Sequence, residues 1–117
     1  SIRRSGENIS AREIESVAAG IDGVLESAAL GVADELRGEE VKLYLVLQPG
    51  YSVEQVTPQR VIAHCAENLA AFKVPRYIEY MAEFPHTTSG KIAKSELESS
   101  AGNRQRRIFD RSAGAWR

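Results

Sequence analysis

The chain has 117 residues, of which 43% are apolar and 26% charged, values typical of a single globular domain with a modest core. Its net charge of −1 gives no overall attraction to nucleic acid, and no apolar run approaches the roughly 20 residues of a membrane span. The N-terminal residues lack the apolar core of a signal peptide, so we expect a cytoplasmic protein. Cys65 is the only cysteine, which excludes an internal disulfide and a thiolate metal cluster. The two histidines do not have the spacing of metal ligands, and we expect no metal site.

The first half of the chain predicts one helix and two strands. Ser10 and Glu13 have the spacing of a capping box, which satisfies two backbone donors at a helix start, and apolar residues at helical spacing follow them. Residues 24–32 form an apolar run typical of a buried strand. After the polar residues 34–40, residues 41–48 alternate most clearly and predict a second strand.

The second half predicts two further helices and a third strand. The Thr-Pro pair at residues 57–58 is typical of a helix start. An apolar stripe follows it and includes the cysteine, which we therefore place in the core, whereas His64 is expected to face solvent. Residues 72–75 break this helix, residues 76–81 predict a short strand, and residues 92–99 predict a final helix.

The elements follow one another as helix, strand, strand, helix, strand and helix. This order predicts an α+β domain over residues 1–99, in which a small three-stranded sheet is flanked by helices. The remaining residues, 100–117, hold five arginines and one aspartate. Such a charge run is typical of a flexible basic tail, which Phe109 and Trp116 could attach to a partner surface.

One loop has the residue types of an anion site. Residues 85–91 (PHTTSGK) lie between Pro85 and the last predicted helix. Hydroxyls and backbone N–H groups near a helix start favour an anion, and Lys91 adds a charge that can reach a phosphate or a carboxylate. The motif is not a P-loop, which has glycine where this chain has Pro85 and Ser or Thr where it has Ile92. A solvated loop with a surface lysine is the alternative interpretation.

Three separate stretches resemble motifs of the adenylate-forming enzymes, which include acyl-CoA synthetases, peptide-synthetase adenylation domains and luciferases. They are residues 3–10 (RRSGENIS), residues 31–39 (GVADELRGE), and residues 72–75 (FKVP) followed by residues 85–91. Their order and spacing resemble the small C-terminal domain of that family, over residues 2–99. The resemblance implies that this chain lacks the large N-terminal domain, which holds most of the ATP and acyl pocket.

In that family a carboxylic acid attacks the α-phosphate of ATP, bound with Mg²⁺, and the resulting acyl-AMP then reacts with a thiol. The resemblance implies that this domain is a mobile lid, which presents a different face to each half-reaction. Lys91 matches the lysine that stabilises charge during adenylation, and Gly6 matches the loop that enters the active site for the thiol step. Members of the family are switched off by acylation of the matching lysine, which makes Lys91 a candidate for this modification.

The resemblance also implies binding of coenzyme A against this domain. Glu7, Arg37, Phe72, Arg76 and Gly90 match positions near CoA or the substrates in some members. An aromatic ring can stack on adenine and arginines can bind phosphates, although ordinary packing is the alternative for Phe72.

The leading interpretation is therefore the lid of an acyl-CoA synthetase, a ligase that joins a carboxylic acid to CoA. It is expected to be inactive without its N-terminal domain. Two alternatives stay open. One is the C-terminal part of an adenylation domain that loads a carrier protein. The other is a non-catalytic module whose basic tail docks onto an acidic partner.

Overall fold

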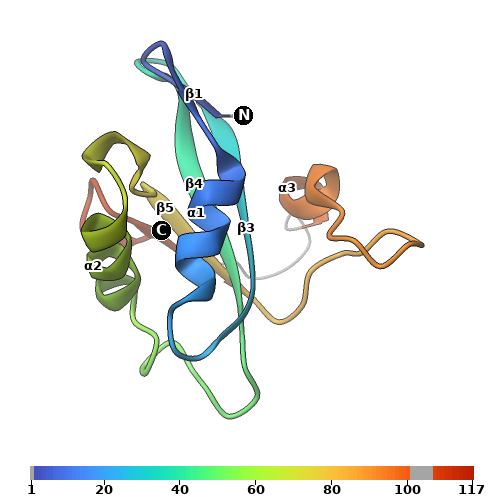
Figure 1. Cartoon of the computed structure of the whole chain (residues 1–117). Helices are drawn as coiled ribbons and strands as arrows, with labels where there is room; N and C mark the ends of the chain where they lie inside the picture. Colours follow the sequence, from blue (N-terminus) through green and yellow to red (C-terminus); the bar gives the residue numbers. More distant parts are fainter. Residues whose placement is uncertain (1, 101–106) are drawn as a thin grey trace.

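The computed structural model describes residues 2–100 and 107–117, except for the side chains of the last two residues of the first range. Its centre is a mixed sheet. Strands β3 (Val24–Asp34) and β4 (Gly38–Leu47) form a long antiparallel pair, and β5 (Tyr77–Met81) runs parallel to β4 on its other side. Figure 1 shows helices α1 (Ala11–Ala19) and α2 (Pro58–Asn68) lying across one face of this sheet.

Short hairpins widen the sheet at both edges. Strands β1 (Ile2–Arg4) and β2 (Glu7–Ile9) pair with each other, and β1 meets the first residue of β4. At the opposite edge β6 (Arg107–Asp110) pairs with β5, and β7 (Ala115–Trp116) pairs with β6. The remaining elements are short helices: η1 (Ala71–Lys73), η2 (Lys94–Glu96) and α3 (Leu97–Ser100).

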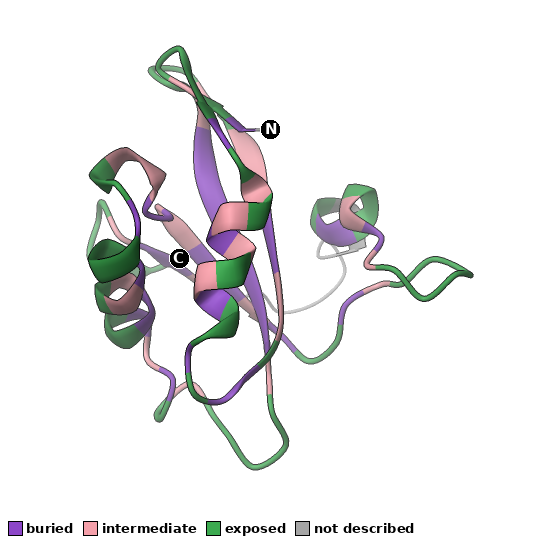
Figure 2. Cartoon of the chain, viewed as in Figure 1, coloured by how far each residue is buried: buried purple, intermediate pink, exposed green. Residues whose placement is uncertain are grey.

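The sheet buries apolar side chains on both faces. On the face covered by α1 and α2, Leu43 and Ile78 belong to the larger core cluster. On the other face Tyr44 packs with Phe84 and with Leu97 of α3. Successive residues of a strand point to opposite faces, so two-sided burial explains why residues 40–46 of β4 are all buried (Figure 2).

The caps predicted from the sequence form in the structure. The N–H of Glu13 donates to Ser10 Oγ at 3.3 Å, and the N–H of Arg60 donates to Thr57 Oγ1 at 3.2 Å. The α+β class and the three predicted strands are confirmed. The sheet is nevertheless larger than three strands, because the outer strands are only two to four residues long and show no readable alternation.

The prediction of a flexible tail is wrong for residues 107–117. Phe109 is only 4% exposed and belongs to the larger core cluster, so it is not free to bind a partner. The ring of Trp116 meets it edge-on at 5.6 Å between centroids. The backbone of β6 pairs with the edge of β5, which would otherwise be exposed. Residues 101–106, also assigned to the tail, lie outside the described residues.

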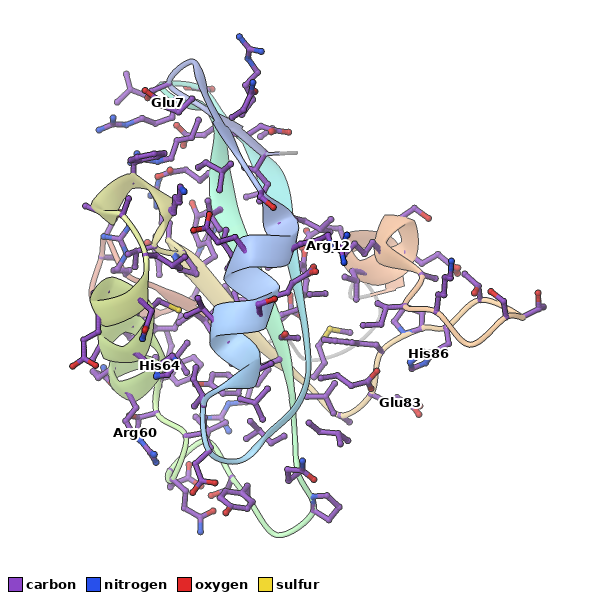
Figure 3. All side chains as sticks on the ribbon, in the orientation of Figure 1. Glu7, Arg12, Arg60, His64, Glu83 and His86 are labelled. Atoms are coloured by element: carbon purple, nitrogen blue, oxygen red, sulfur yellow. The ribbon has the colours of Figure 1, made fainter. Side chains whose placement is uncertain are left out.

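Two smaller predictions also need correction. His64 is half-buried rather than fully solvent-facing, because its Nε2 lies 2.9 Å from the carbonyl oxygen of Val17, between α2 and α1 (Figure 3). The final helix begins later than residue 92. Ile92 forms an isolated antiparallel bridge with His86, and helical geometry starts only at Lys94.

Candidate functional site

Gly6 lies in the tight turn between β1 and β2. Ser5 and Gly6 both have positive φ, at 50° and 84°. The N–H of Ser5 donates to the carbonyl oxygen of Arg37 at 2.8 Å, and one terminal nitrogen of the Arg37 guanidinium lies 3.4 Å from Ser5 Oγ. The β1–β2 turn and the β3–β4 turn therefore lie side by side, at the top of Figure 1. Glu7 is exposed at the same tip and is labelled in Figure 3.

Asp34 holds the β3–β4 turn in place. Its Oδ2 accepts hydrogen bonds from the N–H groups of Leu36 at 3.1 Å and Arg37 at 2.8 Å. This leaves the side chain of Leu36 87% exposed and that of Arg37 exposed beside the Gly6 turn. An exposed apolar side chain next to an exposed guanidinium is suited to a ligand with an aromatic and an anionic part.

Arg76 lies among three carboxylates. Its Nε is 3.2 Å from Asp110, and one terminal nitrogen is 3.4 Å from Asp34 and 3.5 Å from Glu40. The hydrogen bond to Asp110 raises the pKa of Arg76 above its usual range, and the charges of Asp110 and Glu40 act in the same direction. Glu40 also pairs with Arg4. Much of the charge on Arg76 is thus already balanced inside the protein.

Arg37 and Arg76, which the resemblance matched to positions near CoA, line the same surface pocket. The pocket joins the β3–β4 turn to the start of β5 and to the β6–β7 turn. Its lining comprises Arg4, Asp34, Leu36, Arg37, Glu40, Arg76, Arg111 and Ser112. Four arginines against two carboxylates give this lining a positive balance, which favours an anionic ligand.

Phe72 does not line this pocket. It is half-buried in η1, where its ring packs against the larger core cluster and Lys73 Nζ lies 5.7 Å from the ring centroid. These contacts support ordinary packing for Phe72.

Lys91 lies at the end of a hairpin-like loop. The N–H of Thr87 donates to the carbonyl oxygen of Lys91 at 2.7 Å, and the N–H of Gly90 donates to that of Thr87 at 2.9 Å. Gly90 has φ of 87°, a conformation that favours glycine. The loop projects from the body of the molecule on the right of Figure 1, and Lys91 is exposed. Within the described part of the chain, no contact of its ammonium group with another side chain is found.

A histidine–carboxylate contact and an ion pair fix the base of this loop. His86 Nε2 lies 3.1 Å from a carboxylate oxygen of Glu26 on β3, on the side of the molecule shown in Figure 3. Past the loop, Lys94 pairs with Glu15 of α1 and lies 3.5 Å from the carbonyl oxygen of Ala29. Both ends of the loop that carries the exposed Lys91 are therefore attached to the rest of the domain.

The structure does not bring Lys91 and Gly6 together. The Lys91 loop is attached near Glu26, whereas the Gly6 turn is attached near Asp34. These two residues are eight positions apart on one strand, a distance of roughly 27 Å in extended backbone. The two loops are thus attached toward different ends of one sheet. In Figure 1 the Gly6 turn lies at the top, and the Lys91 loop projects to the right.

Sequence reasoning missed Arg111, which lines the pocket between the β3–β4 turn and the β6–β7 turn, and Asp110, which pairs with the pocket residue Arg76. Both lie in the segment interpreted as a tail. Arg111 donates through Nε to the carbonyl oxygen of Pro75 at 2.9 Å, next to Arg76. Only the apolar pair Ile108 and Phe109 before them could have indicated a strand.

No metal site and no membrane helix is found among the described residues. No group of three or more histidine, cysteine, aspartate or glutamate side chains there could hold a metal ion. No helix in residues 2–100 and 107–117 is both long and apolar enough to cross a bilayer.

Comparison with known proteins identifies the family. The family model described as the AMP-binding enzyme C-terminal domain matches residues 13–91. The chain belongs to this family. The matched range of the AMP-binding C-terminal domain includes Lys91, Arg37 and Arg76, whereas Gly6 and strands β6 and β7 lie outside it.

Relatives of this domain are ligases. The chain is 37% identical over 97 residues to a crotonobetaine/carnitine–CoA ligase of Salmonella arizonae, covering 83% of the chain and 18% of that enzyme. A fatty acyl CoA synthetase of Mycobacterium tuberculosis matches 85% of the chain with 33% identity and a TM-score of 0.78, over 19% of its own length. ATP-bound MatB from Rhodopseudomonas palustris matches 87% of the chain with 28% identity and a TM-score of 0.78, over 20% of its length. The chain thus spans about a fifth of the length of the proteins it matches.

Proposed function

We propose that this chain is the mobile C-terminal domain of an ATP-dependent acid–thiol ligase, most similar to the acyl-CoA synthetases. In this proposal the domain supplies Lys91 to the adenylation step and the Gly6 turn to the thioester step. Its partners are the N-terminal part of the same enzyme, a carboxylic acid, ATP and coenzyme A. The CoA ligases among its relatives support this choice over a carrier-protein-loading domain and over a docking module without catalytic activity.

The observation that supports this proposal most directly is the separation of the two candidate groups. Lys91 and Gly6 lie on loops that are attached toward different ends of one sheet and project in different directions, so one orientation of the domain would not bring both into one active site. A domain that turns between two orientations would present each in turn. Rigid-body motion of this kind is a common way to serve two steps in succession.

During adenylation the exposed ammonium of Lys91 would face the oxygens of the carboxylate and the α-phosphate. Negative charge on these oxygens is redistributed as the acyl–phosphate bond forms. A positioned cation stabilises that charge without taking part in proton transfer. A Cβ built on Gly90 meets no atom within 4 Å, so the space beside the turn that precedes Lys91 is open. ATP would bring Mg²⁺, which no cluster of the described residues fits, so no step here depends on a metal ligand from them.

During the thioester step the Gly6 turn would face the active site. A Cβ built on Gly6 meets no atom within 4 Å, so the space beside its backbone is open to a narrow ligand. We assign the adjoining pocket, which is lined by Arg4, Arg37, Arg76 and Arg111, to the phosphates of CoA. Arg37 would be the main contact, because it is exposed and pairs with no carboxylate among the residues that the structure describes, whereas Arg76 is held by three. Glu7 lies beside this path at the hairpin tip.

The test uses the full-length enzyme and measures the half-reactions separately. Lys91→Ala should lower acyl-AMP formation by ~10²–10³-fold, by analogy with the loss of one oxyanion-hole donor. It should leave thiol transfer from preformed acyl-AMP intact. Gly6→Leu should do the reverse.

The matched control is Gly50→Leu. Gly50 has φ of 87° and, like Gly6, no atom within 4 Å of a built Cβ, so it carries the same backbone strain at a distant turn. It should affect neither half-reaction. If both half-reactions fell together in the Lys91 and Gly6 variants, the two-ended assignment would be refuted. Replacing CoA by a carrier protein as the thiol acceptor distinguishes the two kinds of ligase.

The isolated chain should be inactive, because the proposal leaves the ATP and acyl pocket to the rest of the enzyme. The measurement is pyrophosphate release by purified residues 1–117 with ATP and a set of carboxylic acids. The control is the same chain with Lys91→Ala. Release above that control would show that this domain contains a complete site.

A further inference from the structure

We propose that Asp110 is a positioning residue of the thioester step, acting through a network of ion pairs that ends beside the Gly6 turn. This inference rests on the proposed function of that turn. Asp110 belongs to β6, which lies outside the residues matched by the family model. The proposal therefore assigns a role to a part of this chain that the family comparison leaves without one.

The first branch of the network leads from β6 to the hairpin. Asp110 Oδ1 lies 3.2 Å from Arg76 Nε, and a terminal nitrogen of Arg76 lies 3.5 Å from Glu40 Oε2. The other oxygen of Glu40 pairs with Nε of Arg4, which is the last residue of β1. Arg4 pairs in register with Glu7, and Ser5 and Gly6 form the turn between them. Four charged side chains thus connect β6 to the base of the hairpin.

The second branch leads to the neighbouring turn. The same terminal nitrogen of Arg76 lies 3.4 Å from Asp34 Oδ1. The other oxygen of Asp34 accepts the N–H groups that fix the β3–β4 turn, including that of Arg37 at 2.8 Å. The carbonyl oxygen of Arg37 in turn accepts the N–H of Ser5 at 2.8 Å. Both branches start from Arg76. The first ends at Arg4, just before the Ser5–Gly6 turn, and the second ends at Arg37, which accepts the N–H of Ser5.

Asp110 is the fixed end of this network. It is 7% exposed, and its neighbour Phe109 is buried in the larger core cluster. Its Oδ1 accepts the N–H of Ser112 at 3.0 Å. The N–H of Arg111 donates to the carbonyl oxygen of Arg76 at 2.7 Å. The side chain of Arg111 donates to the carbonyl oxygens of Pro75 at 2.9 Å and Val74 at 3.3 Å. The carboxylate that binds Arg76 is therefore fixed by a backbone hydrogen bond and by the burial of its neighbour Phe109.

The Gly6 hairpin depends on such outside support. Its strands have three residues each, and a hairpin of that size is not stable on its own in water. Ser5, Gly6, Glu7 and Asn8 are exposed, so the contacts that orient the turn are those at its base. When the charge of Asp110 is removed, its hydrogen bond with Arg76 becomes weaker, and the longer ion pairs of Arg76 with Asp34 and Glu40 remain. The guanidinium of Arg76 then moves toward them, and both branches shift.

The experiment compares half-reactions in the full-length enzyme. Asp110→Asn keeps the shape of the side chain and removes its charge. Thiol transfer from preformed acyl-AMP should fall on the order of tenfold, within the ~10²-fold that a misplacement of about 1 Å can cause. Acyl-AMP formation should stay within about twofold of the wild type, and this also shows that the domain is folded, because the same domain supplies Lys91. Asp22→Asn, the same change at an exposed turn residue, should alter neither rate.

A second variant tests the network rather than one residue. Arg4→Gln, at the opposite end, should show the same split between the half-reactions. The double variant with Asp110→Asn should be no slower than the slower single variant, because both changes interrupt one path. Fully additive losses would overturn the network, as would equal loss of both half-reactions or wild-type thiol transfer in Asp110→Asn.

Gly6→Leu separates the two proposals. If it leaves thiol transfer unchanged, the proposed function fails. If it blocks thiol transfer and Asp110→Asn does not, only the present inference fails.

Discussion

The N–H of Ser5 donates a 2.8 Å hydrogen bond to the carbonyl oxygen of Arg37, and this bond joins two turns that are 32 residues apart in the sequence. Ser5 has a positive φ of 50°, and Gly6 follows with φ of 84°. The geometry of this bond therefore depends on a backbone conformation that residues with a side chain adopt at a cost. The position of Arg37 relative to the Gly6 turn is in this way fixed by the backbone itself.

Gly6→Ala should destabilise the chain by about 1 kcal/mol, because alanine is strained at this φ although its Cβ has free space. Gly50→Ala is the matched control, with the same φ region and the same free space, and should cost about as much. Urea unfolding measures both losses. Only Gly6→Ala should also speed hydrogen exchange of the Ser5 amide. Unchanged protection of that amide would show that the Ser5–Arg37 bond does not depend on Gly6.

Phe109→Ala should destabilise the chain by about 3–5 kcal/mol, the usual cost of removing a buried aromatic side chain. Phe109 is 4% exposed and pairs across strands with Ile78. Trp116→Ala is the comparison. Trp116 is 42% exposed and contacts Phe109 and Tyr80 only at its ring edges or at a tilt, so about 1 kcal/mol is expected. Thermal or urea unfolding gives both values. A negligible effect of Phe109→Ala would mean that β6 is not part of the folded core.

Local signals in the sequence were sufficient for the interior of the fold. The cap at Ser10 was predicted because its bond joins residues three positions apart, and the helix start at Thr57 was predicted because proline follows it. The strand around Leu43 was predicted from the alternation of residues 41–48, and the strand around Ile78 was predicted as a short strand after the break at residues 72–75. The Lys91 loop was also placed correctly between the last long strand and the final helical turn.

Contacts between residues that are far apart in the sequence leave no such local signal. Arg76 and Asp110 are 34 residues apart, and nothing in either neighbourhood of the sequence indicates their contact. Phe109 was assigned to a tail because five arginines dominate the composition around it. The family resemblance therefore implied that Arg76 binds a ligand, and the composition predicted a flexible C-terminal tail. The structure joins the two, and this changes which arginine is available to a ligand.

Cys65 should be inert in the folded chain. Burial raises the pKa of its thiol to about 11, from an ordinary value near 9, and the side chain is 0% exposed. Two pKa units reduce the reactive thiolate by about 10²-fold at pH 8, and burial further restricts access. Alkylation by iodoacetamide should therefore be slow in buffer and fast in urea. Equal rates in the two solvents would contradict a buried thiol.

The stability of the chain should depend on pH through Asp110. Burial on its own would raise the pKa of this carboxyl. The hydrogen bond and charge of Arg76, together with the backbone N–H groups of Ser112 and Ala113, outweigh burial and hold the pKa below its usual range. A carboxyl with a lowered folded-state pKa binds protons more weakly in the folded state than in the unfolded state. Its contribution to stability is therefore complete above the unfolded-state pKa, near 4, and is lost as the pH falls through the folded-state value.

Asp110→Asn removes this dependence. At pH 7 the variant should be less stable than the wild type by about 1–3 kcal/mol, the range for a hydrogen bond to a charged partner. The difference should shrink as the pH falls below about 4, because the wild-type carboxyl becomes protonated there as well. Urea unfolding at a series of pH values measures this, with Asp22→Asn as the control for loss of a surface charge. A gap between wild type and Asp110→Asn that stayed constant down to pH 2.5 would show that the Arg76–Asp110 pair does not lower the pKa of Asp110.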